Sequence, residues 1–159
     1  MTVKETGGIV LLFSLAMSSC QTQSPDVAAV EAGVRGLLQQ YSESINSGDW
    51  SGVLDLYSDD KRFHWAEDGQ LAYPSKAAVA AGLEGLASSL ESTEIRAGEV
   101  QITALSDRHA LAAFSYEQSL VFSSGQSFRF SGFITMTLQR EGADWKILAG
   151  HSSSPRRRQ

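Results

Sequence analysis

The chain has 159 residues, of which 42% are apolar, and it contains only three prolines. This composition excludes a disordered, collagen-like or fibrous chain and fits one globular domain of ordinary size. The formal net charge is −5. Because the basic cluster 156–158 lies at the C-terminus, the rest of the chain is more acidic still, which argues against nucleic acid as a partner.

The N-terminal segment differs in kind from the rest of the chain. Lys4 precedes the apolar stretch GGIVLLFSLAM, which is shorter than the roughly 20 residues that span a bilayer but fits a secretory signal. The following MSSC resembles the lipobox of bacterial lipoproteins, in which the cysteine is lipidated and becomes the mature N-terminus. Cys20 is the only cysteine. The alternatives are a start assigned too early or a buried helix with an unreactive thiol.

The lipobox resemblance implies a signal peptide at residues 1–19 and an acyl anchor on Cys20. Residues 20–26 then form a short polar tether. We expect a location in the bacterial cell envelope outside the cytoplasm, with membrane contact only through the lipid anchor. Residues 154–159 form a basic tail, read either as a solvated terminus or as a weak contact to an anionic surface.

Three helices are predicted next. Apolar residues at 27, 30, 34, 37, 38, 41 and 45 indicate an amphipathic helix that stops at NSGD. Asp49 is placed to cap a shorter second helix, and Ser75 to cap a third helix with Val79, Leu83, Leu86 and Leu90 on one stripe. Between the second and third helices, KRFHWA is a short strand candidate with EDGQ as its turn.

After the third helix, the apolar residues recur at every second position, as in a β-strand. Strands are predicted at 93–105, 108–122, 127–140 and 144–153, and the short polar connections SDR, SSGQ and REGAD make them antiparallel neighbours. The predicted fold is α+β, with three N-terminal helices packed on a strongly curved antiparallel sheet in a cone-shaped roll. One domain, residues 27–153, holds all of these elements.

The strings YSESINSGDWSGVLDLYSDD and EGADWKILAGHSS, with the third helix between them, resemble the nuclear-transport-factor-2-like superfamily and its small SnoaL-like members. The resemblance implies a cone with an apolar cavity, and it implies sheet faces that often pair in dimers. The superfamily includes isomerases, dehydratases, cyclases, epoxide hydrolases and non-catalytic binding or assembly domains. The resemblance therefore leaves the chemistry open.

His151 is the first candidate site residue. Strict alternation along WKILAGHSSS puts His151 on the same face as Trp145 and Ile147, and related sequences often carry a cavity-facing histidine at the end of the last strand. A neutral imidazole there could act as a general base or as a hydrogen-bonding group. The alternative is a structural histidine bonded to a backbone carbonyl or to a partner chain.

Aromatic residues supply the other candidates for the cavity wall, with ordinary core packing as the alternative for each. They are Tyr41, Tyr57, Trp65 and Tyr116. Ketosteroid-isomerase-type chemistry needs a carboxylate in the cavity beside a tyrosine. Glu117 alternates away from Tyr116, and Asp49 is accounted for as a cap, so the sequence offers no such carboxylate. His64, His109 and His151 lack metal-ligand spacing, no Gly-rich phosphate loop is present, and no cofactor is expected.

Three hypotheses follow. The first is an exported, lipid-anchored domain that binds a small apolar or amphipathic molecule through Tyr41, Tyr57, Trp65, Tyr116 and His151. The second is a cofactor-free lyase or isomerase with His151 as general base and Tyr116 as polarising donor. The third is a homodimeric assembly module with a filled cavity, and in any case we expect a homodimer joined through the face that bears Arg129, Phe133 and Thr135. A cavity of about 300 Å³ or more would favour the first two hypotheses.

Overall fold

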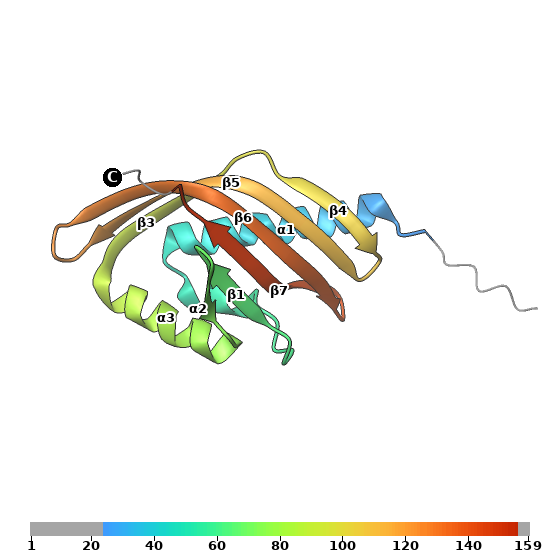
Figure 1. Ribbon diagram of the computed structural model, residues 1–159, viewed down its shortest axis with the longest axis horizontal. Helices are drawn as coiled ribbons and strands as arrows, with labels where there is room; N and C mark the ends of the chain where they lie inside the picture. The colour runs from blue at the N-terminus through green and yellow to red at the C-terminus, as the bar shows by residue number, and fades with distance from the viewer. Residues whose placement is uncertain (1–23, 156–159) are drawn as a thin grey trace, which may run out of the picture.

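The computed structural model describes residues 24–155 (Figure 1). Its elements in chain order are α1 (Val27–Ser47), α2 (Trp50–Asp55), β1 (His64–Glu67), β2 (Gln70–Tyr73), α3 (Lys76–Ser89), β3 (Leu90–Ala97), β4 (Gln101–Ser106), β5 (His109–Phe122), β6 (Ser127–Glu141) and β7 (Asp144–Ser153). The predicted signal peptide, the lipidation of Cys20 and most of the basic tail lie outside the described residues.

The helices begin where the sequence predicts. The Asp26 carboxylate accepts the Ala29 N–H at 3.1 Å at the start of α1, and Asp49 accepts the Gly52 N–H at 2.9 Å at the start of α2. The Ser75 hydroxyl accepts an N–H at 3.2 Å at the start of α3. Each side chain satisfies a backbone donor that the first helical turn leaves without a partner.

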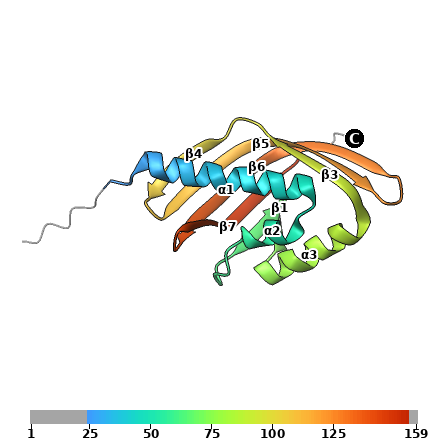
Figure 2. The same cartoon turned by 180° about the vertical axis from the view of Figure 1, so that it is seen from behind.

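A seven-stranded sheet follows the order β2-β1-β7-β6-β5-β3, and β4 pairs with β5 beside β3. All the pairs are antiparallel except β1 with β7, which run parallel. The sheet curls without closing, and the three helices lie on its concave side (Figures 1 and 2). The predicted α+β class is confirmed.

The strand predicted at 93–105 is two strands. β5 is 14 residues long, so β3 pairs with its second half and β4 with its first half. The chain crosses from one to the other at Gly98, whose N–H donates to the Ser115 carbonyl at 2.8 Å. The polar pattern alone does not reveal this break, because the period of two continues on both sides of it.

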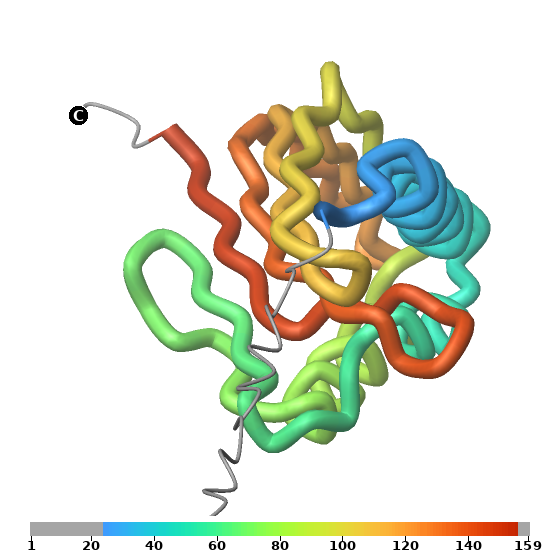
Figure 3. Tube along the Cα trace, turned by 90° about the vertical axis from the view of Figure 1, so that its right-hand side faces the viewer, coloured from blue at the N-terminus to red at the C-terminus, as the bar shows by residue number. Residues whose placement is uncertain are grey.

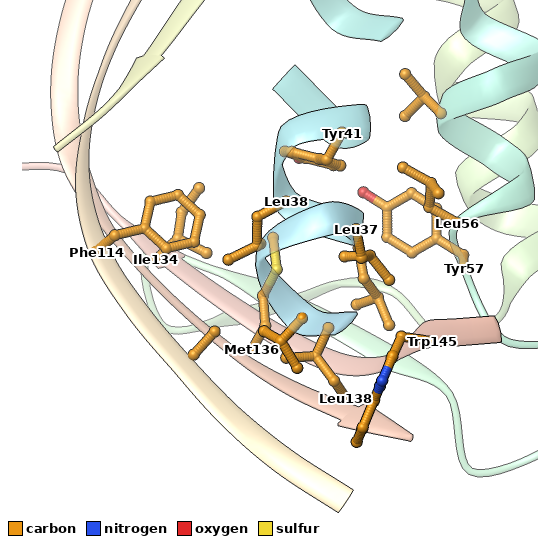
Figure 4. Close-up of a cluster of buried hydrophobic side chains, with 14 of the residues drawn as sticks. Leu37, Leu38, Tyr41, Leu56, Tyr57, Phe114, Ile134, Met136, Leu138 and Trp145 are labelled. Carbon is orange, nitrogen blue, oxygen red and sulfur yellow. The ribbon is translucent and has the colours of Figure 1, made fainter. Parts of the chain in front are cut away.

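The core lies between α1 and the concave face of β5, β6 and β7. The apolar stripe predicted for α1 is buried from Val30 to Ile45, while Val27 at its start is 49% exposed. Leu37 and Leu38 of α1 face Met136, Leu138 and Trp145 of the sheet (Figure 4). Within residues 24–155, no helix combines the length and the apolar character that crossing a membrane requires.

Candidate functional site

A β-bulge in β7 decides which side chains of that strand reach the interior. Leu138 of β6 pairs with Ile147, whereas the preceding Thr137 pairs with Ala149, so Leu148 is an extra residue. The N–H of Ile147 donates to the Leu56 carbonyl at 2.8 Å, which ties this part of β7 to the chain after α2. A bulge of one residue exchanges the two faces for every later position.

His151 therefore lies on the outer face of the sheet. It pairs with Thr135 of β6 and with Ala66 of β1, and its side chain is exposed. Gly150 and Ser152 take the inward positions instead. The prediction that His151 follows Trp145 and Ile147 into a cavity is wrong, and the general-base role that depended on it loses its geometric support.

Two adjoining cavities, of about 280 Å³ and about 220 Å³, open between the inner face of the sheet, α1, α3 and the β1–β2 hairpin. Both are lined by Tyr41, Trp65, Glu67, Gln118 and Phe130. We call the two together the cone cavity. Its larger part is close to the volume expected of a small-molecule site.

The structure brings four of the five predicted ligand-binding residues to the cone cavity. Tyr41 and Trp65 line both of its parts, Tyr57 lines the larger part, and Tyr116 lines the smaller part. Tyr57 packs edge-on against Trp65, with ring centroids 6.1 Å apart at 82°. Their part in binding stays a prediction.

The apolar stripe of α3 forms a wall of the cavity. Of the predicted stripe, only Val79 is fully buried, while Leu83, Leu86 and Leu90 are half-buried and line the larger part. A helix that faces a hollow shows the same apolar spacing as a helix that faces a packed core. The third helix was therefore predicted correctly, except that Leu90 begins β3, but its apolar stripe did not show that the helix faces the cavity.

The hairpin EDGQ carries a carboxylate that the sequence analysis did not single out. Asp68 and Gly69 have positive φ angles of 47° and 86°, and Glu67 pairs with Gln70, as in a two-residue hairpin turn. Glu67 is two residues after Trp65 and shares its inward face. Figure 3 shows this hairpin (green) beside β7 (red).

Hydrogen bonds to the end of β7 hold this turn in place. The Asp68 N–H donates to the Ser152 carbonyl at 3.0 Å. The Asp68 carboxylate accepts the Ser154 N–H at 2.7 Å and the Ser154 hydroxyl at 2.9 Å. Pairing of β1 with β2 and β7, together with these hydrogen bonds, therefore holds Glu67 at the cavity mouth.

All four tyrosines of the sequence lie within electrostatic range of Glu67. Burial raises the pKa of Tyr41 to about 12, and burial followed by the interaction with Tyr41 raises the pKa of Tyr57 well above its usual value. The Tyr57 hydroxyl donates to the Tyr41 oxygen, and Figure 4 shows it directed toward α1. The phenols of this pair therefore stay protonated at neutral pH.

Glu67 is exposed at the cavity mouth, yet its carboxyl reaches the cavity wall. Burial raises the pKa of Glu67, a hydrogen bond from Trp65 partly offsets this, and the neighbouring charge of Asp68 raises the pKa further. A carboxyl with a raised pKa that faces tyrosines in a cavity is the group that ketosteroid-isomerase-type chemistry needs, and Glu67 was not among the predicted site residues. The spacing of Glu67 two residues after Trp65 is the signal that could have identified it.

Two glycines make room for the aromatic wall. A Cβ atom at Gly150 would collide with the ring of Trp65 across the parallel β1–β7 pair. A Cβ atom at Gly132 would collide with the ring of Tyr116 and with the Ser153 carbonyl. These positions need glycine because an aromatic ring lies too close to the backbone there to leave room for a side chain.

The cone cavity is lined by side chains of three kinds: aromatic, aliphatic, and a few polar groups with oxygen atoms. Gln118 is the one amide among them, and its Nε2 lies 3.4 Å from the Thr93 hydroxyl. Among the described residues, His, Asp and Glu do not form a group of three or more that could hold a metal ion. Hydrogen bonding and acid–base chemistry are what these groups offer.

Comparisons with solved structures agree with this architecture. A candidate scytalone dehydratase from Novosphingobium aromaticivorans superposes with a TM-score of 0.75 at 12% identity, over 81% of this chain and 86% of that one. A nuclear-transport-factor-2-like protein from Salmonella enterica superposes with a TM-score of 0.71 at 15% identity, over 82% of this chain and 94% of that one. A hexachlorocyclohexane dehydrochlorinase from Novosphingobium barchaimii superposes with a TM-score of 0.67 at 11% identity, over 81% of this chain and 88% of that one. At these identities the likeness shows the fold alone.

The sequence itself matches a described family. No curated protein matches the chain. The SnoaL-like domain family matches it over residues 34–157, which include α2, α3, every strand and most of α1. The chain belongs to the SnoaL-like domain family, within the nuclear-transport-factor-2-like fold.

Proposed function

We propose that this protein binds a small apolar or amphipathic molecule in the cone cavity. The observation that carries the proposal is a hollow walled by Tyr41, Trp65 and Phe130, with Glu67 and Gln118 as convergent polar groups. A site of mostly apolar walls with a few fixed polar groups is the usual form of a small-molecule pocket. A filled core, as an assembly module would have, does not need this space.

The neutral fluorescent probe N-phenyl-1-naphthylamine tests this proposal. Its emission should rise when it is added to the full-length chain. Gln118→Phe should weaken binding by about tenfold or more, because the larger ring fills both parts of the cavity. Ser119→Phe places the same ring on the outer face and should leave binding unchanged. Equal affinity in both variants would contradict the proposal.

A second candidate function rests on Glu67. A cofactor-free lyase or isomerase needs a base in the cavity, and a carboxyl with a raised pKa is a stronger base than an ordinary one. Tyr41 or Tyr116 would then polarise the substrate carbonyl by donating a hydrogen bond. Glu67 takes the place that the sequence analysis gave to His151.

Proton exchange separates this candidate from simple binding. In D2O, the full chain should speed deuterium uptake at the α-carbon of 2-tetralone, a ketone of suitable size, as followed by NMR. Glu67→Gln should remove the acceleration, while Glu117→Gln on the outer face should keep it. If exchange runs at the uncatalysed rate with the unaltered chain, the enzymatic candidate is rejected and the binding proposal stands.

We also infer that the protein is a homodimer and that the outer sheet face joins the two copies. Phe133 is 47% exposed in the middle of that face, beside Thr135 and His151, and no helix of the described chain covers it. Phe133 pairs with Ser115 of β5 and with Ser153 of β7, and these small side chains would let a second sheet approach closely. His151 would then be a contact residue of the interface.

Finally, we propose that the domain is exported and anchored through lipid on Cys20, because MSSC follows an apolar segment of signal-peptide length. Mass spectrometry of the protein from its native host should find an acylated N-terminal Cys20. An intact Met1, or a mature chain with an unmodified Cys20, would reject the anchor.

A further inference from the structure

The charged groups of the cone cavity all have one sign. Glu67 and Asp68 line it, and among the described residues that line its two parts none is Lys, Arg or His. Asp68 is engaged by Ser154, so Glu67 is the carboxylate that reaches the larger part. The chain as a whole is also acidic, with a net charge of −5. The long-range field and the local field therefore both favour a cation over an anion.

The walls around Glu67 suit a cation with apolar substituents. Tyr41, Tyr57, Trp65 and Tyr73 line the larger part together with Phe130. Aromatic rings attract a positively charged head through their quadrupoles, and the attraction strengthens where water is excluded. Burial raises the pKa of Glu67 and so disfavours its charged form, whereas a cation bound beside the carboxylate would favour that form.

The remaining wall suits the rest of such a molecule. Leu83 and Leu86 of α3, Leu90 at the start of β3 and Leu120 of β5 give the larger part an aliphatic side. A metal ion or another inorganic cation has no apolar group that could pack against this aliphatic surface. We propose that the cone cavity selects a small organic cation, an alkylammonium or quaternary ammonium compound, with its charged head beside Glu67 and its apolar part against α3.

This inference rests on the proposed binding function, and three probes of equal shape keep the two apart. Choline carries a trimethylammonium head, 3,3-dimethylbutan-1-ol is its neutral isostere, and 3,3-dimethylbutanoate is an anion with the same tertiary-butyl group. Binding of each to the full-length chain is measured by NMR titration. Choline should bind about tenfold more tightly than the alcohol. The butanoate should bind more weakly than both.

Variants of the carboxylate decide whether it causes the preference. Glu67→Gln should bring choline and the alcohol to within about twofold, because the amide keeps the shape and removes the charge. Glu67→Lys should reverse the order and favour the butanoate. Glu117→Gln, which removes a carboxylate of the outer face, should keep the preference of the unaltered chain.

Several results would overturn the cation proposal. Equal or tighter binding of the alcohol, the absence of choline binding, or a choline preference that survives in Glu67→Gln would each do so. If N-phenyl-1-naphthylamine still binds in a manner sensitive to Gln118→Phe, the binding function stands without the cation preference. If it does not, the proposed function falls as well.

Discussion

Glu67 is held at a cost to folding stability, as expected of a group retained for binding or catalysis. Its pKa is higher in the folded chain than in the unfolded chain because burial disfavours the charged form. The folded state therefore binds the proton more tightly, and the cost is present in full above the raised pKa. The cost fades as the pH falls through the raised pKa toward the ordinary value of about 4.3.

Replacing this carboxylate should stabilise the protein. At pH 7, Glu67→Gln should raise the melting temperature by about 2 °C. The gain should shrink as the pH falls toward 4, where Glu67 of the unaltered chain becomes protonated. Part of the gain comes from removing the repulsion between Glu67 and Asp68, because the charge of Asp68 also raises the pKa of Glu67. The four tyrosines have raised pKa values and stay uncharged between pH 4 and pH 7 in both proteins. A loss of stability at pH 7, or a gain that grows in acid, would contradict this account of Glu67.

Gly150 should be as important to the site as the side chains that line it. Gly150→Ala would push a methyl group into the ring of Trp65 and should lower the free energy of unfolding by about 1–3 kcal/mol, as measured by urea denaturation. Gly36→Ala is the control, because a Cβ atom there meets nothing within 4 Å on α1. That change should stabilise by about 0.5–1 kcal/mol. Equal effects of the two substitutions would reject the close packing of Trp65 on Gly150.

At the scale of elements, Asn46 joins α1 to the sheet. Its amide donates to the Ile95 carbonyl at 3.1 Å and accepts the Ile95 N–H at 2.6 Å. β3 lies at the edge of the sheet, so Asn46 occupies backbone groups that a further strand would otherwise use. The motif NSGD was predicted to end a helix, but the sequence did not predict the hydrogen bonds of Asn46 to β3.

Removing this contact should loosen β3. Asn46→Ala should lower the free energy of unfolding by about 0.5–1.5 kcal/mol for each hydrogen bond lost. Asn46→Asp keeps the acceptor for the Ile95 N–H and should lose less. Hydrogen exchange of the Ile95 amide gives a local readout, with faster exchange expected in Asn46→Ala. Unchanged exchange of that amide would contradict the role of Asn46.

The periodic pattern of apolar residues in the sequence predicts some features of this fold and not others. The predicted helix starts at Asp49 and Ser75 follow from local hydrogen bonds, so the sequence shows them directly. The position of His151 depends on a bulge at Leu148, which forms because Ile147 pairs with residues far away in the chain. No local pattern marks such a bulge, and one extra residue was enough to move the histidine to the opposite face.

The same limit applies to the cavity. Tyr41, Tyr57, Trp65 and Tyr116 were placed on inward faces from the sequence, because aromatic residues on apolar stripes point inward. Tyr73, which also lines the larger part, was not predicted. Glu67 was missed because it was assigned to the turn EDGQ, whereas it is the last residue of β1, and because its place depends on a parallel pairing with β7. The apolar stripe that holds Leu83 and Leu86 could face a packed core or a cavity. Which of the two it faces depends on the elements packed opposite the helix, which the local sequence does not show.

At the scale of the whole molecule, the curved sheet has two distinct faces. The concave face holds the core and the cone cavity, while the outer face carries Phe133, Thr135 and His151 without a covering layer in the described chain. An uncovered sheet face with an exposed aromatic residue at its centre is suited to a second copy. The two faces can therefore serve association and ligand binding independently.

Light scattering of the full chain at micromolar concentration should give the mass of a dimer. Phe133→Glu should shift it to a monomer, because the charge would be buried in the interface without a partner. Phe128→Glu is the matched control: Phe128 is 54% exposed on the same strand but points to the other face. A monomeric unaltered chain, or a dimer that Phe133→Glu does not affect, would contradict the interface.

The three tryptophans of the chain give the most direct test of ligand binding in the cone cavity. Trp50 and Trp65 line the cavity, whereas Trp145 lies in the core away from it, beside Gly33. The indole N–H resonances of the full-length chain are followed by NMR as N-phenyl-1-naphthylamine is added. If the ligand enters the cavity, the signals of Trp50 and Trp65 should shift in a saturable manner while that of Trp145 stays in place. Movement of the Trp145 signal alone, or no shift of the other two at saturating probe, would contradict it.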